Sequence, residues 1–203
     1  MMMAASEVIG IRQQIADRLR GDIISGALAP NQKVTEESLA QRFGVSRGPI
    51  RDVLLELSKE GLLITRANRD TRVNDIPPPE LQALMVRLRL DIEAYAIRRV
   101  AKQASPELIE RLEAAVAELS RRLREGDFTE VTKADIAFHR TIVFEAGGED
   151  LANLWQPVIM RMRMNYQRIT TPDQSIGEHE AILEAIRSGN AKRAEEALRD
   201  NIR

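Results

Sequence analysis

The sequence predicts a mainly α-helical protein with an N-terminal winged helix-turn-helix and a C-terminal all-α antiparallel helical bundle. Three observations lead to this prediction. Residues 36–63 carry two short helical patterns of apolar residues that meet at Gly44, and two strand-like runs follow them. Residues 77–79 are three consecutive prolines, which are typical of a semi-rigid linker. Beyond the prolines, the apolar residues follow helical periodicity alone.

The paired helices are indicated by their caps and their apolar positions. Thr35 is a good N-cap for the first helix, and Gly44 suits its left-handed end because glycine has no Cβ. Ser46 is expected to cap the second helix, and Pro49 is tolerated in its first turn. The second helix has the apolar spacing of a helix that packs on a core, at Ile50, Val53, Leu54 and Leu57.

The other face of the second helix carries Arg47 and Arg51 near its N-terminus. In a helix-turn-helix protein this end enters the DNA major groove, so the two arginines predict a contact with double-stranded DNA. The alternative is an ordinary helical hairpin with a solvated arginine face. Charge favours DNA only weakly, since residues 8–75 hold 11 Lys+Arg against 9 Asp+Glu in a chain of net charge −1.

The segments on either side complete a winged helix. A helix over residues 11–25 repeats an apolar residue every four positions, at Ile11, Ile15, Leu19 and Ile23. Strand-like runs at 62–65 and 71–74 flank a cationic tip and predict a hairpin. Three of its arginines are expected to reach phosphate or the minor groove, namely Arg66, Arg69 and Arg72. A merely solvated hairpin is the alternative.

Six helices are expected beyond the prolines. They cover residues 79–103, 106–124, 128–146, 149–169, 175–188 and 190–202, with a kink in the fourth at Pro157. The chain has no cysteine, which excludes disulfides and thiolate metal sites. Nothing in it resembles a signal peptide or a membrane-spanning run, so we expect a cytoplasmic protein without a membrane partner.

Both histidines of the chain and one aspartate lie on apolar helical faces. Asp135 and His139 are four positions apart and share a helical face. His179 begins another core-facing stripe. Buried polar groups need partners, and a divalent metal such as Zn²⁺, Ni²⁺ or Mn²⁺ would satisfy all three. The alternative is a buried Asp–His hydrogen bond, with water on the second histidine.

Several motifs together resemble those of a known family. They are I23-x-x-G26-x-L28-x-P30, the run L39-A-x-x-F-G-V-S-R47-x-P49-I-R51 to L62, R89-x-x-x-E93, D135-x-x-F138-H139 and E178-H179-x-A181-I182. The chain is identified as a member of the GntR-family transcription regulators, and its second domain is similar to that of the FadR-like subfamily with an FCD domain. The resemblance covers nearly the whole chain from Ile11.

The resemblance implies a division of labour along the chain. Together with the residue pattern it predicts a DNA-binding domain at 11–75, a proline linker at 76–79 and a helical effector-binding and dimerisation domain at 80–203. Residues 1–10 precede the resemblance and are expected to be a flexible N-terminus. Ser46, Arg47 and Arg51 match DNA-contacting positions, and Asn68 matches the wing-tip glycine. The full set of expected DNA-binding residues is Thr35, Ser46, Arg47, Gly48, Pro49, Arg51, Arg66, Asn68 and Arg69. Glu37 stands where some relatives have a DNA-contacting arginine.

In the family's helical domain, an aspartate and three histidines bind a divalent metal, beside which an organic-acid effector docks. Asp135, His139 and His179 match three of these ligands. The candidate fourth position, 22 residues after His179, holds Asn201, whose amide oxygen is a poorer ligand than imidazole. Arg89 is a candidate effector-binding residue, although an ion pair with Glu93 is the alternative. Arg161 and Arg163 cannot both face the same cavity, and the sequence does not choose between them.

We therefore expect a homodimeric transcription regulator, not an enzyme, that reads two half-sites of a near-palindromic operator and responds to a small organic acid. Two alternatives remain open. One is a metal-dependent enzyme acting on a small carboxylate through Asp135, His139 and His179, but no separate general base or nucleophile is evident. The other is a constitutive DNA-binding dimer whose bundle is only structural.

Overall fold

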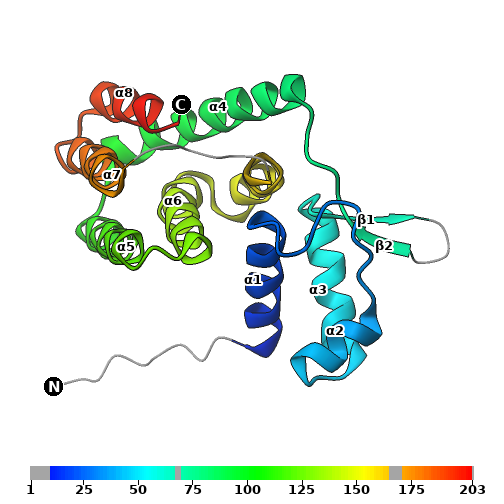
Figure 1. Ribbon diagram of the computed structural model, residues 1–203. Helices are drawn as coiled ribbons and strands as arrows, with labels where there is room; N and C mark the ends of the chain where they lie inside the picture. Colours follow the sequence, from blue (N-terminus) through cyan, green and yellow to red (C-terminus); the bar gives the residue numbers. More distant parts are fainter. Residues whose placement is uncertain (1–9, 67–69, 165–170, 203) are drawn as a thin grey trace, which may run out of the picture. The chain divides into compact units, whose positions relative to one another are not determined.

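The computed structural model describes residues 10–66, 70–164 and 171–202, and the chain divides into two compact units, Met1–Asp75 and Ile76–Arg203. Each unit is described by itself, and Figure 1 shows their helices and strands. Asn68 and Arg69 of the expected wing tip lie outside the described residues. So do residues 1–9 of the expected flexible N-terminus.

The N-terminal unit is a winged helix-turn-helix. Its elements are α1 (Ile11–Ile24), α2 (Glu36–Phe43), α3 (Arg47–Lys59), β1 (Leu63–Arg66) and β2 (Asp70–Val73). The two strands pair antiparallel with Leu63 opposite Val73, and an isolated bridge joins Lys33 to Arg72 at the edge. Strand β1 lies one residue later than expected and β2 one residue earlier. The backbone N–H of Leu62 closes the turn after α3 on the carbonyl of Leu57, and β1 begins at the next residue.

The core of this unit forms between α1 and α3. Ile15, Leu19 and Ile23 are buried together with the expected stripe of α3, which is Ile50, Val53, Leu54 and Leu57. Ile11 was expected on the same stripe but is 52% exposed, because it lies in the first turn of α1. Arg20 also joins the two helices. Its Nε and Nη2 donate to the Glu60 carboxylate, both at 2.8 Å, and its guanidinium also pairs with Glu56.

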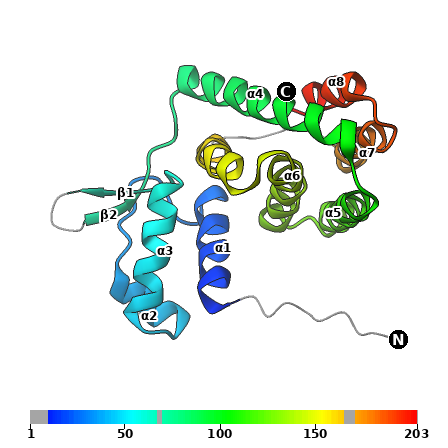
Figure 2. The ribbon, with the colours of Figure 1, turned by 180° about the vertical axis from the view of Figure 1, so that it is seen from behind.

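The C-terminal unit is an all-α bundle. Its elements are α4 (Pro79–Gln103), α5 (Pro106–Glu125), α6 (Phe128–Arg163), α7 (Pro172–Arg187) and α8 (Ala191–Asn201). In Figure 2, α6 passes through the bundle, packed against α4 and α5, while α7 packs against α8 and α5. None of the described helices is long and apolar enough to cross a membrane.

The third and fourth expected helices form one element with a sharp break. Within α6, where every residue is described, only Gly147 and Gly148 depart from helical φ/ψ, while Pro157 stays in helical geometry. Gly148 has φ 59° and ψ −152°, a conformation that is essentially restricted to glycine. A Cβ at Gly147 would lie 2.7 Å from the Cβ of Leu151. The break expected between residues 146 and 149 is therefore found at the glycine pair, whereas no departure from helical φ/ψ accompanies the kink expected at Pro157.

Two other helix boundaries also differ from the expected ones. Helix α6 ends at Arg163 instead of residue 169, and α7 begins at Pro172 instead of 175. Helix α7 starts earlier because Pro172 fits its first turn. The Thr171 hydroxyl also caps it by accepting a hydrogen bond from the Gln174 N–H at 3.2 Å.

Candidate functional site

The helix-turn-helix is held by caps on either side of its turn. Thr35 Oγ1 accepts a hydrogen bond from the Ser38 N–H at 3.1 Å and caps α2, as expected. Gly44 has φ 66°, the left-handed conformation that the turn requires. Ser46 occupies the N-cap position of α3 in an extended conformation, but its side chain makes no capping hydrogen bond within the described chain. Ser46 is an exposed residue at the start of α3.

The residues expected to contact DNA form an exposed face on α3, opposite its buried stripe. Arg47 and Arg51 have side chains that are 61% and 65% exposed. Gly48 lies between them, and a Cβ there would meet no described atom within 4 Å, so folding does not require glycine at this position. Of the other described residues in the set, Pro49 is half-buried, and three are exposed, namely Thr35, Ser46 and Arg66. We name the surface of Ser46, Arg47, Gly48 and Arg51 the α3 face.

Carboxylates of α2 pair with the arginines of the α3 face. Arg51 donates through Nε and Nη2 to the two oxygens of Glu36, at 3.1 and 3.0 Å. These hydrogen bonds, with the charge of Glu36, raise the pKa of Arg51. Arg47 lies 3.4 Å from Glu37 in a looser pair. Exposed pairs of this kind are weak, so a nucleic-acid partner can displace the carboxylates.

One wing arginine is tied within its own domain. Arg72 donates from Nε to Asp70 at 2.7 Å and from Nη1 to the carbonyl of Asn31 at 3.0 Å. This side chain braces the base of the wing, and the expected contact of Arg72 with DNA stays a prediction. Arg66 at the end of β1 remains exposed.

A buried polar network lies in the helical unit, centred on Glu93 of α4. Its Oε1 accepts hydrogen bonds from Arg89 Nε and Trp155 Nε1, both at 2.7 Å, and its Oε2 lies 2.7 Å from His139 Nδ1. Burial would raise the pKa of Glu93, but the charges and hydrogen bonds of Arg89 and His139 lower it to about 2. The ion pair that was the alternative for Arg89 is thus formed, and both side chains are 2% exposed. An effector contact for Arg89 stays a prediction.

The three expected metal ligands are brought together beside this network. Asp135, His139 and His179 are buried, and each offers a ligand atom within 4.8 Å of the others. His179 Nδ1 lies 2.7 Å from the carbonyl oxygen of Ser175, which favours a proton on Nδ1 and leaves the lone pair on Nε2. That Nε2 lies 3.3 Å from Asp135 Oδ1. We name Asp135, His139 and His179 the Asp–His–His cluster.

His139 is arranged in the same way. Its Nδ1 faces the Glu93 carboxylate, and its Nε2 is buried without a hydrogen-bond partner among the described residues. Burial lowers the pKa of His139, which favours the neutral imidazole that metals bind. Backing of a ligating imidazole by a carboxylate is a common outer-shell arrangement at metal sites. The donor set of the cluster therefore fits a divalent metal.

Asn201, the candidate fourth ligand, lies beside His179. Its side chain is buried, and its Nδ2 is 3.4 Å from His179 Nδ1, the nitrogen that faces Ser175. Because the His179 Nδ1 proton goes to the Ser175 carbonyl, the Asn201 Nδ2 cannot donate to that nitrogen, and the 3.4 Å approach is a packing contact. Three ligands are thus brought together, and a fourth ligand from Asn201 stays a prediction.

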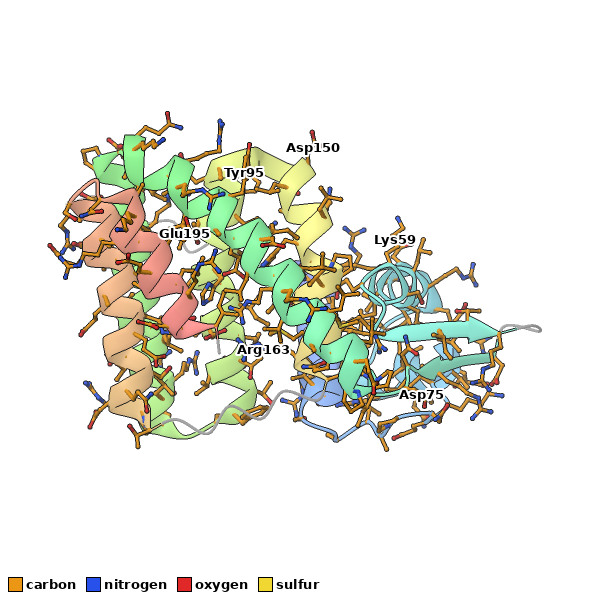
Figure 3. The ribbon with its side chains drawn as sticks, turned by 90° about the horizontal axis from the view of Figure 1, so that it is seen from above. Lys59, Asp75, Tyr95, Asp150, Arg163 and Glu195 are labelled. Carbon is orange, nitrogen blue, oxygen red and sulfur yellow. The ribbon has the colours of Figure 1, made fainter. Side chains whose placement is uncertain are left out.

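The structure also chooses between the two arginines at the end of α6. Arg163 pairs through Nη2 with Asp135 Oδ2, whereas Arg161 donates to the sulfur of Met164 at 2.9 Å. Burial would raise the pKa of Asp135, but the Arg163 charge and His179 hold it well below its usual range. Figure 3 labels Arg163 within the helical unit.

The break in α6 makes the pair between Asp135 and Arg163 attainable. In a straight helix, residues 28 positions apart would be separated by about 42 Å. The non-helical Gly147–Gly148 step turns the second half of α6 back along the first half. Sequence reasoning missed Arg163 as the partner of Asp135 and Trp155 as the partner of Glu93, because both contacts depend on this turn.

The surface hollow between α5 and α7 is a poor candidate for an organic acid. It has a volume of about 470 Å³ and is lined partly by Val116, Ala117 and Leu183. Three carboxylates also line it, from Glu113, Glu180 and Glu184, against the single cation of Arg187, which already pairs with Glu113 and Glu184. The hollow therefore repels small anions, and the Asp–His–His cluster is the better candidate.

Comparisons with known proteins identify both units. Residues 84–203 match the FCD domain family, and residues 11–73 match the family described as bacterial regulatory proteins, gntR family. A similar relative is the uncharacterized HTH-type transcriptional regulator YdhC of Bacillus subtilis (strain 168), 26% identical over 188 residues, which are 90% of this chain and 84% of that protein. Another is the HTH-type transcriptional repressor RspR of Escherichia coli (strain K12), 24% identical over 95% of this chain and 86% of its own. Among solved structures, E. coli McbR/YncC shares the fold with a TM-score of 0.78, at 19% identity, over 96% of this chain and 94% of that chain.

Proposed function

Since this chain belongs to the GntR-family regulators that carry an FCD domain and is a DNA-binding transcription regulator, we propose that a small organic acid bound in its helical domain controls its affinity for an operator. One observation supports the choice of DNA-contacting residues. The two arginines of the α3 face point to solvent, while the opposite stripe of the helix is fully packed.

The DNA contacts are proposed for the expected set of residues. Arg47 and Arg51 would reach guanine edges or phosphates in the major groove, since a guanidinium matches guanine O6 and N7. Ser46, Thr35 and the backbone beside Gly48 would contact phosphates and fix the register of the helix. Arg66 and the wing-tip residues Asn68 and Arg69 would reach the neighbouring groove.

The assembly proposed is a homodimer that acts on the chromosome in the cytoplasm. Two-fold symmetry would set two copies of α3 on half-sites about one helical turn apart, so the operator would be near-palindromic. An effector that binds one arrangement of the subunits better than another would shift the population between them, and with it the operator affinity.

The effector site is proposed at the Asp–His–His cluster. Its residues would hold Zn²⁺, Ni²⁺ or Mn²⁺, and the metal would supply a Lewis acid that binds a carboxylate. The chain's own part is to orient both imidazoles through Glu93 and Ser175, and to exclude water by packing Phe138 edge-on against both rings, with ring centres 5.4 and 5.0 Å away. Elemental analysis of the purified protein tests the metal.

Two measurements test the proposed function. Operator fragments selected from random DNA by the purified protein should contain an inverted repeat, and their binding should weaken steeply with salt. A panel of small carboxylates should then raise the melting temperature and change operator affinity in the same order, because a ligand stabilises the state it binds. Selection of no sequence at low salt would refute DNA recognition by the α3 face. Operator binding that no carboxylate alters would favour a structural bundle.

A further inference from the structure

The two oxygens of Asp135 have different partners. Oδ1 faces His179 Nε2 at 3.3 Å, and Oδ2 pairs with Arg163 Nη2. The side chains of Asp135 and Arg163 are about nine-tenths buried, with 11% and 10% exposed. The carboxylate thus already has a protein-supplied cation at the edge of the cluster that would receive a metal.

A buried carboxylate needs such a cation. Removing one partner of a buried pair leaves an uncompensated charge in a medium of low polarity, which is strongly destabilising. Arg161, two residues earlier, does not supply the charge, because its Nη1 contacts the sulfur of Met164. Arg163 therefore balances Asp135 within the cluster.

A divalent metal in the same cluster would need an oxygen of Asp135 together with the free nitrogens of the two histidines. His139 Nε2 is buried and has no hydrogen-bond partner among the described residues, which leaves it available. The guanidinium of Arg163 would then lie on the same carboxylate as the metal, and like charges at this distance in a buried site repel strongly. Each cation should therefore weaken the binding of the other to Asp135.

We propose that Arg163 and a divalent metal are alternative cations for Asp135, so that Arg163 keeps the cluster intact without metal and weakens metal binding by competing for the carboxylate. This inference rests on the proposed metal-binding capacity of the Asp–His–His cluster. It predicts that Arg163 makes the metal dispensable for folding.

The test compares the full chain with Arg163→Met and Arg163→Gln, which remove the charge, and with Arg163→Lys, which keeps it. Arg161→Met is the matched control, an arginine of the same turn that does not touch Asp135. Melting temperatures are measured in EDTA and with excess Zn²⁺, Ni²⁺ or Mn²⁺, and metal affinity is measured by competition with a chromophoric chelator.

In EDTA the wild type should keep its melting temperature, whereas Arg163→Met should lose roughly 10 °C and regain most of it with metal. Its metal affinity should exceed that of the wild type by at least about tenfold, and Arg163→Lys and Arg161→Met should stay near the wild type. The double variant Asp135→Asn with Arg163→Met should melt near the wild type and ignore metal, because neither buried charge remains.

Three results would overturn the inference. The first is a wild type that melts far lower in EDTA, which would make the metal indispensable. The second is an Arg163→Met variant that binds metal no more tightly than the wild type. The third is that the charge-removing variants fold neither with metal nor without it. Charge-removing variants that fold only when metal is present would instead support the inference. Operator binding of the wild type is measured separately, so failure of the regulator proposal is distinguishable from failure of this one.

Discussion

Arginine–carboxylate pairs occur in both units of this protein, but in opposite surroundings. On the α3 face, Arg47 and Arg51 are more than half exposed and pair with carboxylates at the start of α2. In the bundle, Arg89 and Arg163 are almost fully buried with Glu93 and Asp135. Water and salt weaken the first kind of pair, while loss of one partner is costly in the second. The exposed arginines can change partners, and the buried ones keep the site in one arrangement.

This contrast fits the two tasks of a ligand-responsive regulator. A surface that must bind and release DNA benefits from arginines that are already largely solvated. Such side chains can leave their carboxylate partners at little cost in free energy. A pocket that must distinguish one small ligand from another benefits from groups whose positions are over-determined. The Arg20 pairs with Glu56 and Glu60 show that the DNA-binding unit also uses partly buried pairs, but between α1 and α3 and away from the α3 face.

The largest expected effect comes from removing the charge at the centre of the buried network. Glu93→Gln leaves the buried Arg89 without its counter-ion and should lower the free energy of unfolding by about 3–5 kcal/mol. Denaturant unfolding monitored by helical circular dichroism measures the change. Glu184→Gln, which removes an exposed carboxylate paired with Arg187, is the control and should stay near the wild type. Equal stability of the two variants would contradict the proposed difference between buried and exposed arginine–carboxylate pairs.

The buried network should also make the protein acid-sensitive. The pKa of His139 is lowered from 6.5, so below pH 6.5 the unfolded chain binds a proton that the folded chain excludes, and stability begins to fall. The pKa of Glu93 is lowered from 4.5 to about 2, so its contribution, about 3 kcal/mol, is present above pH 4.5 and is lost as the pH falls toward 2. Denaturant titrations at several pH values measure this.

The Glu93→Gln variant provides the control for the acid response. It lacks the titrating carboxyl group, so its stability should depend less on pH between 4.5 and 2 than that of the wild type. Parallel pH profiles for the two proteins would show that another group causes the loss.

A smaller effect is expected from the exposed pair. Arg47→Ala should cost about 1–3 kcal/mol of operator affinity, while changing the free energy of unfolding by less than about 0.5 kcal/mol. Lys192→Ala in the bundle, whose side chain is 89% exposed, is the matched control and should bind the operator normally. Fluorescence anisotropy with a labelled operator measures both. An unchanged affinity for the Arg47 variant would remove α3 as the recognition helix.

The smallest effect should come from the carboxylate that holds Arg51. Glu36→Gln weakens the two hydrogen bonds to the guanidinium and removes a negative charge beside the proposed DNA-binding surface. Binding to DNA of unrelated sequence should rise by about two- to fivefold at low salt and by less at high salt, because exposed charges are screened. Weaker non-specific binding would show that Glu36 positions Arg51 for DNA and does not compete with it.

The sequence by itself determined the helices, the turn at Gly44, the wing and the inward direction of Asp135, His139 and His179. These features follow from local rules, since helical and strand periodicity and cap chemistry depend on neighbours along the chain. Even the break between the two halves of α6 was visible as Gly147-Gly148, although not its conformation.

Tertiary structure alone decided which partners the buried polar groups find. Arg163 meets Asp135, Trp155 meets Glu93, and Asn201 lies on the Nδ1 side of His179. The first two contacts join residues 28 and 62 positions apart, and periodicity cannot say which long side chain crosses to which helix. Those contacts depend on the angle of a glycine bend and on the rotamers that close packing allows, and both are set only when the whole bundle is assembled.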